Sequence, residues 1–221
     1  MNAYAFELAG EALQALPSGA LAWPGAATLI VSDLHLGRSE RYARRGGALL
    51  PPYEVEDTLA RLDADIGALA PRRVICLGDS FDDLAAAALD ERALLWLARL
   101  MAGRHWIWIE GNHDPGPVAL GGEHRAEMAL GPLRFRHVAT ETGTGEISGH
   151  YHPKLGIAGR ACRCFLADSR RVILPAYGTY TGGLRSDGPV LSALMGPGAI
   201  AILTGAVARP LPLPREAPRR C

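Results

Sequence analysis

Lysine is almost absent from this sequence, and long apolar runs are missing from it. Of the 23 lysine and arginine residues, all but Lys154 are arginine, and aspartate and glutamate together also number 23. The resulting net charge of zero gives no sign of a general surface for nucleic acid or membrane. No apolar run reaches the roughly 18 residues that a transmembrane helix requires. Composition therefore favours a soluble protein with no membrane association.

Cysteine is also scarce, with four residues in the chain. Cys76 lies in an apolar run, where a small core residue is expected. Cys162 and Cys164 are two positions apart, so in a strand they share a face, which is poor geometry for a disulfide. Cys221 is the last residue of the sequence. This pattern fits a reducing compartment and argues against a zinc site built from cysteines alone.

Length and composition suit one globular domain. The chain has 221 residues, of which 48% are hydrophobic and 21% charged, and such a chain can bury a sizeable core. The segment before the first basic residue, Arg38, contains Glu7 and Glu11, which is the opposite of a signal peptide. We therefore expect a cytoplasmic protein. Residues 1–208 are expected to form a single domain, followed by a flexible tail rich in proline and arginine over 209–221.

The first half of the chain alternates between predicted strands and helices. Near-continuous apolar runs at 27–31, 74–77 and 106–109 are typical of strands buried on both faces. Apolar residues at helical spacing predict a helix over 54–66, and a second helix is expected over 90–101.

After residue 120 the pattern changes to short strands separated by glycine-rich turns. These are expected around residues 126–130, 133–138, 145–148, 161–166, 171–174 and 198–203. The combination predicts an α/β domain with two packed sheets flanked by helices.

Polar residues with metal-binding chemistry follow the predicted strands. Three groups come directly after the first three strands: Asp33 and His35, then Asp79 and Asp82, then Asn112, His113 and Asp114. Three histidines occur further on: His137, His150 and His152. The carboxyl ends of several strands meet in one crevice, and these side chains suit Mn²⁺, Fe, Zn²⁺ or Mg²⁺.

The order of these motifs resembles that of the calcineurin-like metallophosphoesterase superfamily. The pattern is D-x-H, G-D-x-x-D, G-N-H-D, a single H and then G-H-x-H, and the resemblance covers roughly residues 27–184. It implies a four-layer αββα fold without a cap domain, and a site for two divalent metal ions, with Mn²⁺ the ion we expect.

The resemblance also implies a ligand set by motif position. Asp33, His35 and His152 would hold the first metal, Asn112, His137 and His150 the second, and Asp79 would bridge both. A shared carboxylate would screen the repulsion between two cations about 3.5–4 Å apart.

The same resemblance implies a mechanism and two further roles. A hydroxide bridging the metals would attack phosphorus in line, because bound metals lower the pKa of water. His113 would protonate the leaving oxygen, and Asp82 would orient His113.

Several local stretches are similar to one branch, the ligase-associated DNA damage response endonucleases (PdeM). They are 33–38 (DLHLGR), 41–47 (RYARRGG), 149–153 (GHYHP) and 174–184 (LPAYGTYTGGL). This similarity implies a DNA endonuclease acting in the DNA damage response, with DNA-repair ligase, helicase or nuclease partners.

A cluster of arginines follows the first motif. Arg38, Arg41, Arg44 and Arg45 stand against Glu40 alone between Leu34 and Tyr53. They could bind the phosphates that flank the cleaved phosphate. The alternative interpretation is a solvated surface in an arginine-rich protein.

Two other functions are compatible with the sequence. The same fold could cleave a nucleotide, a cyclic nucleotide or a phosphomonoester, and a non-catalytic binding scaffold is the third hypothesis. Among the remaining histidines, His105 matches no motif, whereas His124 lies in a glycine-rich segment that could approach a substrate.

Overall fold

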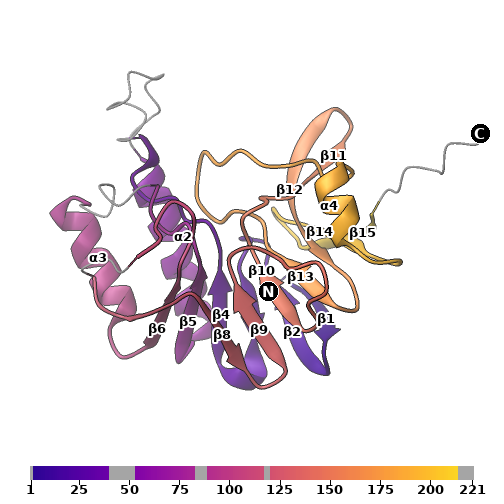
Figure 1. The fold of residues 1–221 in the computed structure, drawn as a ribbon. Coiled ribbons are helices and arrows are strands. Elements are labelled where there is room, and N and C mark those ends of the chain that lie inside the picture. The colour runs from indigo at the N-terminus through magenta and orange to yellow at the C-terminus, as the bar shows by residue number, and fades with distance from the viewer. Residues whose placement is uncertain (1, 40–52, 83–88, 117–119, 214–221) are drawn as a thin grey trace, which may run out of the picture.

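The computed structural model describes residues 2–39, 53–82, 89–116 and 120–213. Two β-sheets stack face to face, with helices α2 and α3 outside the first sheet and helix α4 outside the second (Figure 1). The expected four-layer αββα arrangement is thereby confirmed. The outer layer on the second sheet is thin, because its one described helix has six residues.

The first sheet has seven strands in the order β1 to β7. Their bounds are β1 Tyr4–Leu8, β2 Glu11–Ala15, β3 Leu21–Trp23, β4 Thr28–Val31, β5 Arg73–Leu77, β6 His105–Ile109 and β7 Glu123–Arg125, with a 3₁₀ turn at Pro24–Ala26 before β4. β1 to β4 pair antiparallel, and β4 to β7 pair parallel. The carboxyl ends of β4, β5 and β6 therefore lie along one edge of the sheet.

The second sheet follows the order β15, β14, β12, β13, β10, β9, β8, with β11 paired to β12. Its strands are β8 Glu127–Leu130, β9 Leu133–Arg136, β10 Glu146–Ser148, β11 Lys154–Ile157, β12 Arg160–Ala167, β13 Arg171–Ile173, β14 Ile200–Leu203 and β15 Arg209–Pro212. β9, β10 and β13 are parallel neighbours, so the residues that follow them also meet at one edge.

The helices are α2 (Glu54–Leu69), α3 (Glu91–Met101) and α4 (Pro189–Leu194). Ala70 caps the end of α2 in the left-handed conformation, and Pro71, which cannot continue a helix, follows it. Asp90 caps the start of α3, and its carboxylate accepts a hydrogen bond from Ala93 N at 2.7 Å.

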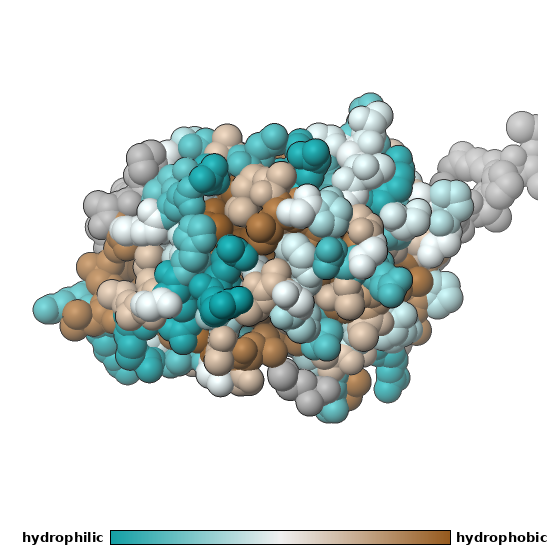
Figure 2. Space-filling view, turned by 90° about the horizontal axis from the view of Figure 1, so that it is seen from below, coloured by the Kyte–Doolittle hydropathy of each residue, from teal (hydrophilic) through white to brown (hydrophobic). Residues whose placement is uncertain are grey.

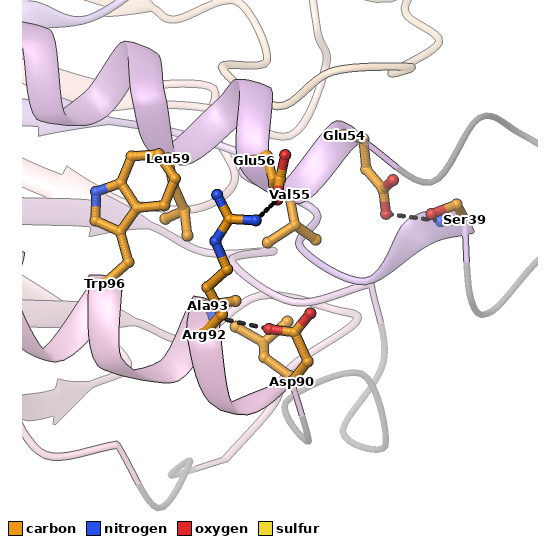
Figure 3. Close-up of a pocket in the computed structure, with 10 residues that line it drawn as sticks. Ser39, Glu54, Val55, Glu56, Leu59, Asp90, Arg92, Ala93 and Trp96 are labelled. Atoms are coloured by element: carbon orange, nitrogen blue, oxygen red, sulfur yellow. Dashed lines mark hydrogen bonds and ion pairs between the residues drawn. The ribbon is translucent and has the colours of Figure 1, made fainter.

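A cavity of about 110 Å³ lies between the start of α2 and the start of α3 (Figure 3). Arg92 of α3 forms an ion pair with Glu56 of α2 across it, with the Nη1–Oε1 distance at 2.7 Å. The buried Glu54 carboxylate accepts a hydrogen bond from Ser39 N at 3.0 Å. Glu54 thereby ties the segment that leaves the first motif to the start of α2.

Strict alternation along the parallel strands divides the core into layers. In β5, Val74 and Cys76 pack toward the helices, whereas Ile75 and Leu77 pack toward the second sheet. A strand places successive side chains on opposite faces, so a continuous apolar run fills both layers at once. A third cluster lies between the second sheet and α4.

Most predicted elements are present, with small shifts of their ends, but one expected boundary is wrong. β15 pairs with β14 from Arg209 to Pro212, so the second sheet continues past the expected limit at residue 208. Residues 214–221, the rest of the expected tail, lie outside the described part of the chain. Sequence patterns also missed β7, β11 and α4.

Among the described residues, the longest helix has 16 residues, and none is long and apolar enough to cross a membrane.

Candidate metal centre

The polar motifs converge at the edge where β4, β5, β6, β9 and β10 end. Five of the residues expected to bind metal have left-handed backbone: Asp33 (φ 53°), His35 (φ 47°), Asp79 (φ 47°), His150 (φ 69°) and His152 (φ 47°). Side chains other than glycine rarely adopt this conformation, and such strain concentrates at functional sites. The motifs thus turn sharply at the strand ends and direct their side chains into one place.

The first donor group consists of Asp33, His35 and His152, each offering one atom within 4.8 Å of the others. His152 Nε2 lies 3.0 Å from Asp33 Oδ1 and 3.4 Å from His35 Nε2. His35 and Asp33 are fully buried, and His152 is largely so. Asp33 Oδ2 accepts hydrogen bonds from Ser32 Oγ (2.5 Å) and His150 N (3.0 Å), which leaves Oδ1 directed at His152.

The second donor group consists of Asp79, His137 and His150. His137 Nε2 lies 3.4 Å from Asp79 Oδ2, 3.1 Å from His150 Nδ1 and 3.0 Å from Asn112 Oδ1. Asn112 therefore offers a fourth donor atom. His137 Nδ1 donates to Leu77 O at 2.7 Å, so its Nε2 presents a lone pair to the group when the ring is neutral.

Burial and mutual charge shift the pKa values of these residues strongly. Burial alone would raise the pKa of Asp79, but contact with His137 and the hydrogen bond from His113 N outweigh it and lower the pKa to about 2. Burial alone would lower the pKa of His137, but Asp79 and Asp33 raise it to about 9. Burial and the charge of His137 lower the pKa of His150. The carboxylates are thus ionised and complementary to a cation.

Asp114 holds the loop after β5 in place. Its Oδ1 accepts hydrogen bonds from Asp79 N (2.9 Å) and Gly111 N (3.1 Å), and its Oδ2 from Ser80 N (2.7 Å) and Phe81 N (3.2 Å). The side chain is buried, and burial raises its pKa despite these donors. The sequence motif left Asp114 without a defined role, and four main-chain donors on one carboxylate show what it does.

Two glycines are required where the motif loops approach one another. A side chain at Gly111 would overlap the main chain and carboxylate of Asp79, and one at Gly149 would overlap Ser32 Oγ. Glycine is thus required by contact with the neighbouring motif at both positions.

The structure joins Asp82 and His113 through a different atom from the one expected. His113 Nδ1 donates to the main-chain oxygen of Asp82 at 2.9 Å. The Asp82 carboxylate instead contacts His35 Nδ1 at 3.0 Å and Arg38 Nη1 at 3.2 Å. Asp82 therefore fixes both rings, His113 by its carbonyl and His35 by its carboxylate. The carboxylate contact holds the His35 ring so that Nε2 points to the first donor group.

The 174–184 stretch, whose sequence shows only the family resemblance and no site residue, packs directly on the first motif. Tyr177 N donates to Ser32 O at 2.8 Å, and Gly178 N donates to Asp33 O at 3.0 Å. Thr179 Oγ1 contacts both Asp57 and Thr58 of α2. This loop therefore links the strained Asp33 main chain to helix α2.

The remaining candidate residues are the arginines after the first motif and His124. Arg38 contacts Asp82 at the site, whereas Arg41, Arg44 and Arg45 fall outside the described residues. His124 lies on β7 and stacks on Trp108 at a centroid distance of 6.4 Å.

On the opposite face of the molecule, charged side chains line a hollow of about 390 Å³ at the amino ends of β5 and β6. Figure 2 views the molecule from below and shows hydrophilic side chains gathered around a hollow. Several charges of this hollow form ion pairs: His105 with Glu123 at 2.7 Å, Arg125 with Glu123, and Glu127 with Arg136, which lies outside the hollow, at 2.7 Å. This hollow is therefore a separate feature from the candidate centre.

The donor atoms fit metal ions. Asp33 Oδ1 is buried and faces His152 Nε2 at 3.0 Å. Burial would raise the pKa of Asp33, but His152 outweighs it and lowers the pKa, so the carboxylate is ionised. A buried ionised oxygen is costly unless a cation or a hydrogen-bond donor contacts it, and Oδ1 points into the donor group where a metal ion would lie. Two imidazole nitrogens and a carboxylate oxygen at each group form a mixed N/O set that suits borderline divalent metals.

Comparison with known proteins agrees with this geometry. The family model described as calcineurin-like phosphoesterase matches residues 27–167, which is more than half of the chain. Among solved structures, the chain is similar to the crystal structure of Pseudomonas putida nuclease MPE, with a TM-score of 0.75 and 29% sequence identity. That alignment covers 95% of this chain and 100% of the other. Comparison with curated proteins gives no match. The resemblance seen in the motifs is confirmed at the level of the family, and the chain belongs to the calcineurin-like phosphoesterases.

Proposed function

We propose that this metal-dependent phosphoesterase hydrolyses phosphodiester bonds in DNA, as an endonuclease of the DNA damage response that uses two Mn²⁺ ions. The observation that carries the proposal is the pair of adjacent donor groups with His113 beside them. The similarity to a nuclease over nearly the whole length of both chains supports a nucleic acid as the substrate. The DNA-repair ligase, helicase or nuclease partners remain part of the same proposal.

Each donor group is proposed to hold one ion. Asp33, His35 and His152 would bind the first, and Asn112, His137 and His150 the second. Asp79 lies in the second group and would bridge both ions; its Oδ1 accepts a hydrogen bond from His113 N at 2.8 Å, and its Oδ2 faces His137 Nε2 at 3.4 Å. When bound, the two ions would supply an activated water as nucleophile and neutralise charge on the phosphate.

His113 is proposed as the acid that protonates the leaving oxygen. Its Nδ1 donates to the Asp82 carbonyl, so Nε2 carries a proton only when the ring is cationic. Nε2 lies 4.0 Å from Asp79 Oδ2, and the side chain is about 30% exposed. The acid is thus held beside the centre on its solvent side, where a leaving oxygen would depart.

The test compares four substrates: a supercoiled plasmid, a circular single-stranded DNA, an aryl phosphodiester and an aryl phosphomonoester. We expect nicking or linearisation of circular DNA, because only an endonuclease can cut a molecule without ends. Activity should vanish with a chelator and return best with Mn²⁺.

The control for the loss of one carboxylate is Asp63→Asn, which changes a residue of α2 that contacts Trp96 and Arg99 of α3, compared with Asp79→Asn at the centre. Asp79→Asn should lose activity, whereas Asp63→Asn should keep it. Hydrolysis of the phosphomonoester or aryl diester with both circular DNAs left intact would reject the endonuclease proposal and favour a small-molecule substrate.

A further inference from the structure

Three cations surround the loop of residues 174–184. Each donates to a main-chain oxygen of this loop: Arg163 Nη1 to Ala176 (3.4 Å), Arg61 Nη1 to Tyr177 (2.7 Å) and Lys154 Nζ to Thr181 (3.1 Å). They come from separate elements, α2, β11 and β12, so the fold gathers them at one place. We call Arg61, Lys154 and Arg163 the loop cations.

Two of the loop cations, Lys154 and Arg163, form no ion pair with any described residue, although the charge of Asp57 acts on Arg163 from a greater distance. Asp57 pairs with Arg61 at 2.7 Å, but in the described part of the chain Lys154 and Arg163 have no carboxylate within ion-pair distance. They face each other directly across the β11–β12 pair. Like charges in directly opposed positions destabilise a sheet. An anion bound between or beside the two side chains would relieve this repulsion.

The two unpaired cations retain hydrogen-bond capacity. A lysine ammonium has three N–H donors and an arginine guanidinium has five, and each uses one donor on the loop. Both side chains are half-buried, so solvent reaches part of them. An anion that arrives from solvent can therefore accept hydrogen bonds from both without disturbing the loop.

The two cations lie next to the first donor group. Lys154 is two residues after His152, and a Cβ placed on Gly183 would lie 3.1 Å from both His152 Cβ and Lys154 Cε. Figure 1 shows the β11–β12 hairpin projecting at the upper side of the molecule beside α4. From Lys154 to Ala167 the hairpin contains three basic residues and no acidic one. A chain of phosphates that leaves the first donor group on this side would meet positive charge.

We propose that Lys154 and Arg163 together bind one backbone phosphate of a polynucleotide strand next to the phosphate that is cleaved. The inference rests on the proposed function, because it assigns the strand that carries the cleaved bond to the β11–β12 side of the centre. Such a contact positions the strand and has no base preference.

The experiment measures binding and cleavage of a fluorescently labelled single-stranded oligonucleotide by the metal-loaded protein. The variant is Lys154→Gln/Arg163→Gln. The matched control is Arg72→Gln/Arg134→Gln, which removes the same charge from exposed arginines away from the centre. Anisotropy at several salt concentrations gives affinity, and kcat/KM is measured for the oligonucleotide and for an aryl phosphodiester.

We expect the Lys154/Arg163 variant to lose about tenfold in affinity, since it lacks a charged hydrogen-bonding site. The slope of log affinity against log salt should flatten by about 0.7, the value for one phosphate contact on a single strand. Lys154→Arg should retain wild-type affinity, because it keeps the charge. Loss of kcat/KM should be at least about fivefold larger on the oligonucleotide than on the aryl diester.

Affinity and salt slope equal to those of the control variant would overturn the inference. An equal loss of kcat/KM on both substrates would also overturn it, since the cations would then act only by holding the loop. If the wild type hydrolyses the aryl diester and cuts no DNA, the proposed function fails, and the anisotropy comparison still decides whether these cations bind a strand.

Discussion

Removal of the Asp114 carboxylate should loosen the loop that carries Asp79. In Asp114→Ala, four main-chain N–H groups lose their acceptor: those of Asp79, Ser80, Phe81 and Gly111. Asp79 has left-handed backbone, with φ at 47°, and these hydrogen bonds hold it there. The variant should therefore lose stability and metal affinity together.

The expected loss of stability follows from the number of hydrogen bonds that are removed. A net loss of about 1 kcal/mol for each hydrogen bond gives about 4 kcal/mol for four. Water that enters the vacated space would reduce this, so we expect about 3 kcal/mol, or roughly 10 °C in Tm for a chain of this size. The stability of Asp114→Asn should lie between those of the wild type and Asp114→Ala, because the amide oxygen can accept hydrogen bonds from only one of the two pairs of N–H donors.

The assay combines thermal unfolding with metal analysis, and Asp90→Ala is the matched control. Asp90 caps α3 by accepting one main-chain hydrogen bond, so its loss should cost about 1 kcal/mol and leave metal content intact. The reasoning is refuted if Asp114→Ala unfolds at the temperature of Asp90→Ala and binds as much metal as the wild type.

Three further predictions concern the centre. Gly149→Ala should lose metal from the first donor group, because its Cβ would overlap Ser32 Oγ. Gly67→Ala lies in open space on α2 and should raise the free energy of unfolding by about 0.5–1 kcal/mol. Metal analysis and urea unfolding of both variants check these two expectations. The pKa of His137 is raised to about 9, so below that pH a metal ion must displace the proton of this ring, and metal affinity should rise with pH up to about 9. Calorimetry in two buffers should detect the released proton below that pH. A metal affinity that does not change with pH would contradict this expectation. His113→Asn should keep the metals but slow hydrolysis of alkyl diesters about 10²–10⁴-fold, and aryl diesters less; equal losses in kcat would exclude His113 as the acid.

The layered fold was predictable because strand periodicity determines it. The runs around Ile75 and Ile107 are apolar at every position, which only a strand buried on both faces requires. Signals in the second half of the chain were weaker. α4 has only six residues, and β15 contains Pro210 and Pro212, which are rare inside strands, so neither could be recognised.

The residues at the centre were predictable, but the contacts that hold them were not. Asp33 and His152 share a donor group although they are far apart in the chain, and strand-end motifs indicated this convergence. The hydrogen bond from Gly178 N to Asp33 O depends on a loop with no chemical motif of its own. The motif indicates that Asp82 approaches His113 but not through which atom, and in the structure the main-chain oxygen of Asp82 contacts His113 while the carboxylate contacts His35.

The central claim is that each donor group binds one metal ion and that Asp79 is the one ligand that the two ions share. The most direct test is a count of metal ions per chain by elemental analysis after loading with Mn²⁺ and removal of free metal. The account predicts two ions in the wild type, one in His137→Ala and one in His35→Ala, because each change removes a ligand from one group. Asp79→Ala should lose both. A wild type with a single ion, or an Asp79→Ala variant that still binds two, would contradict the account.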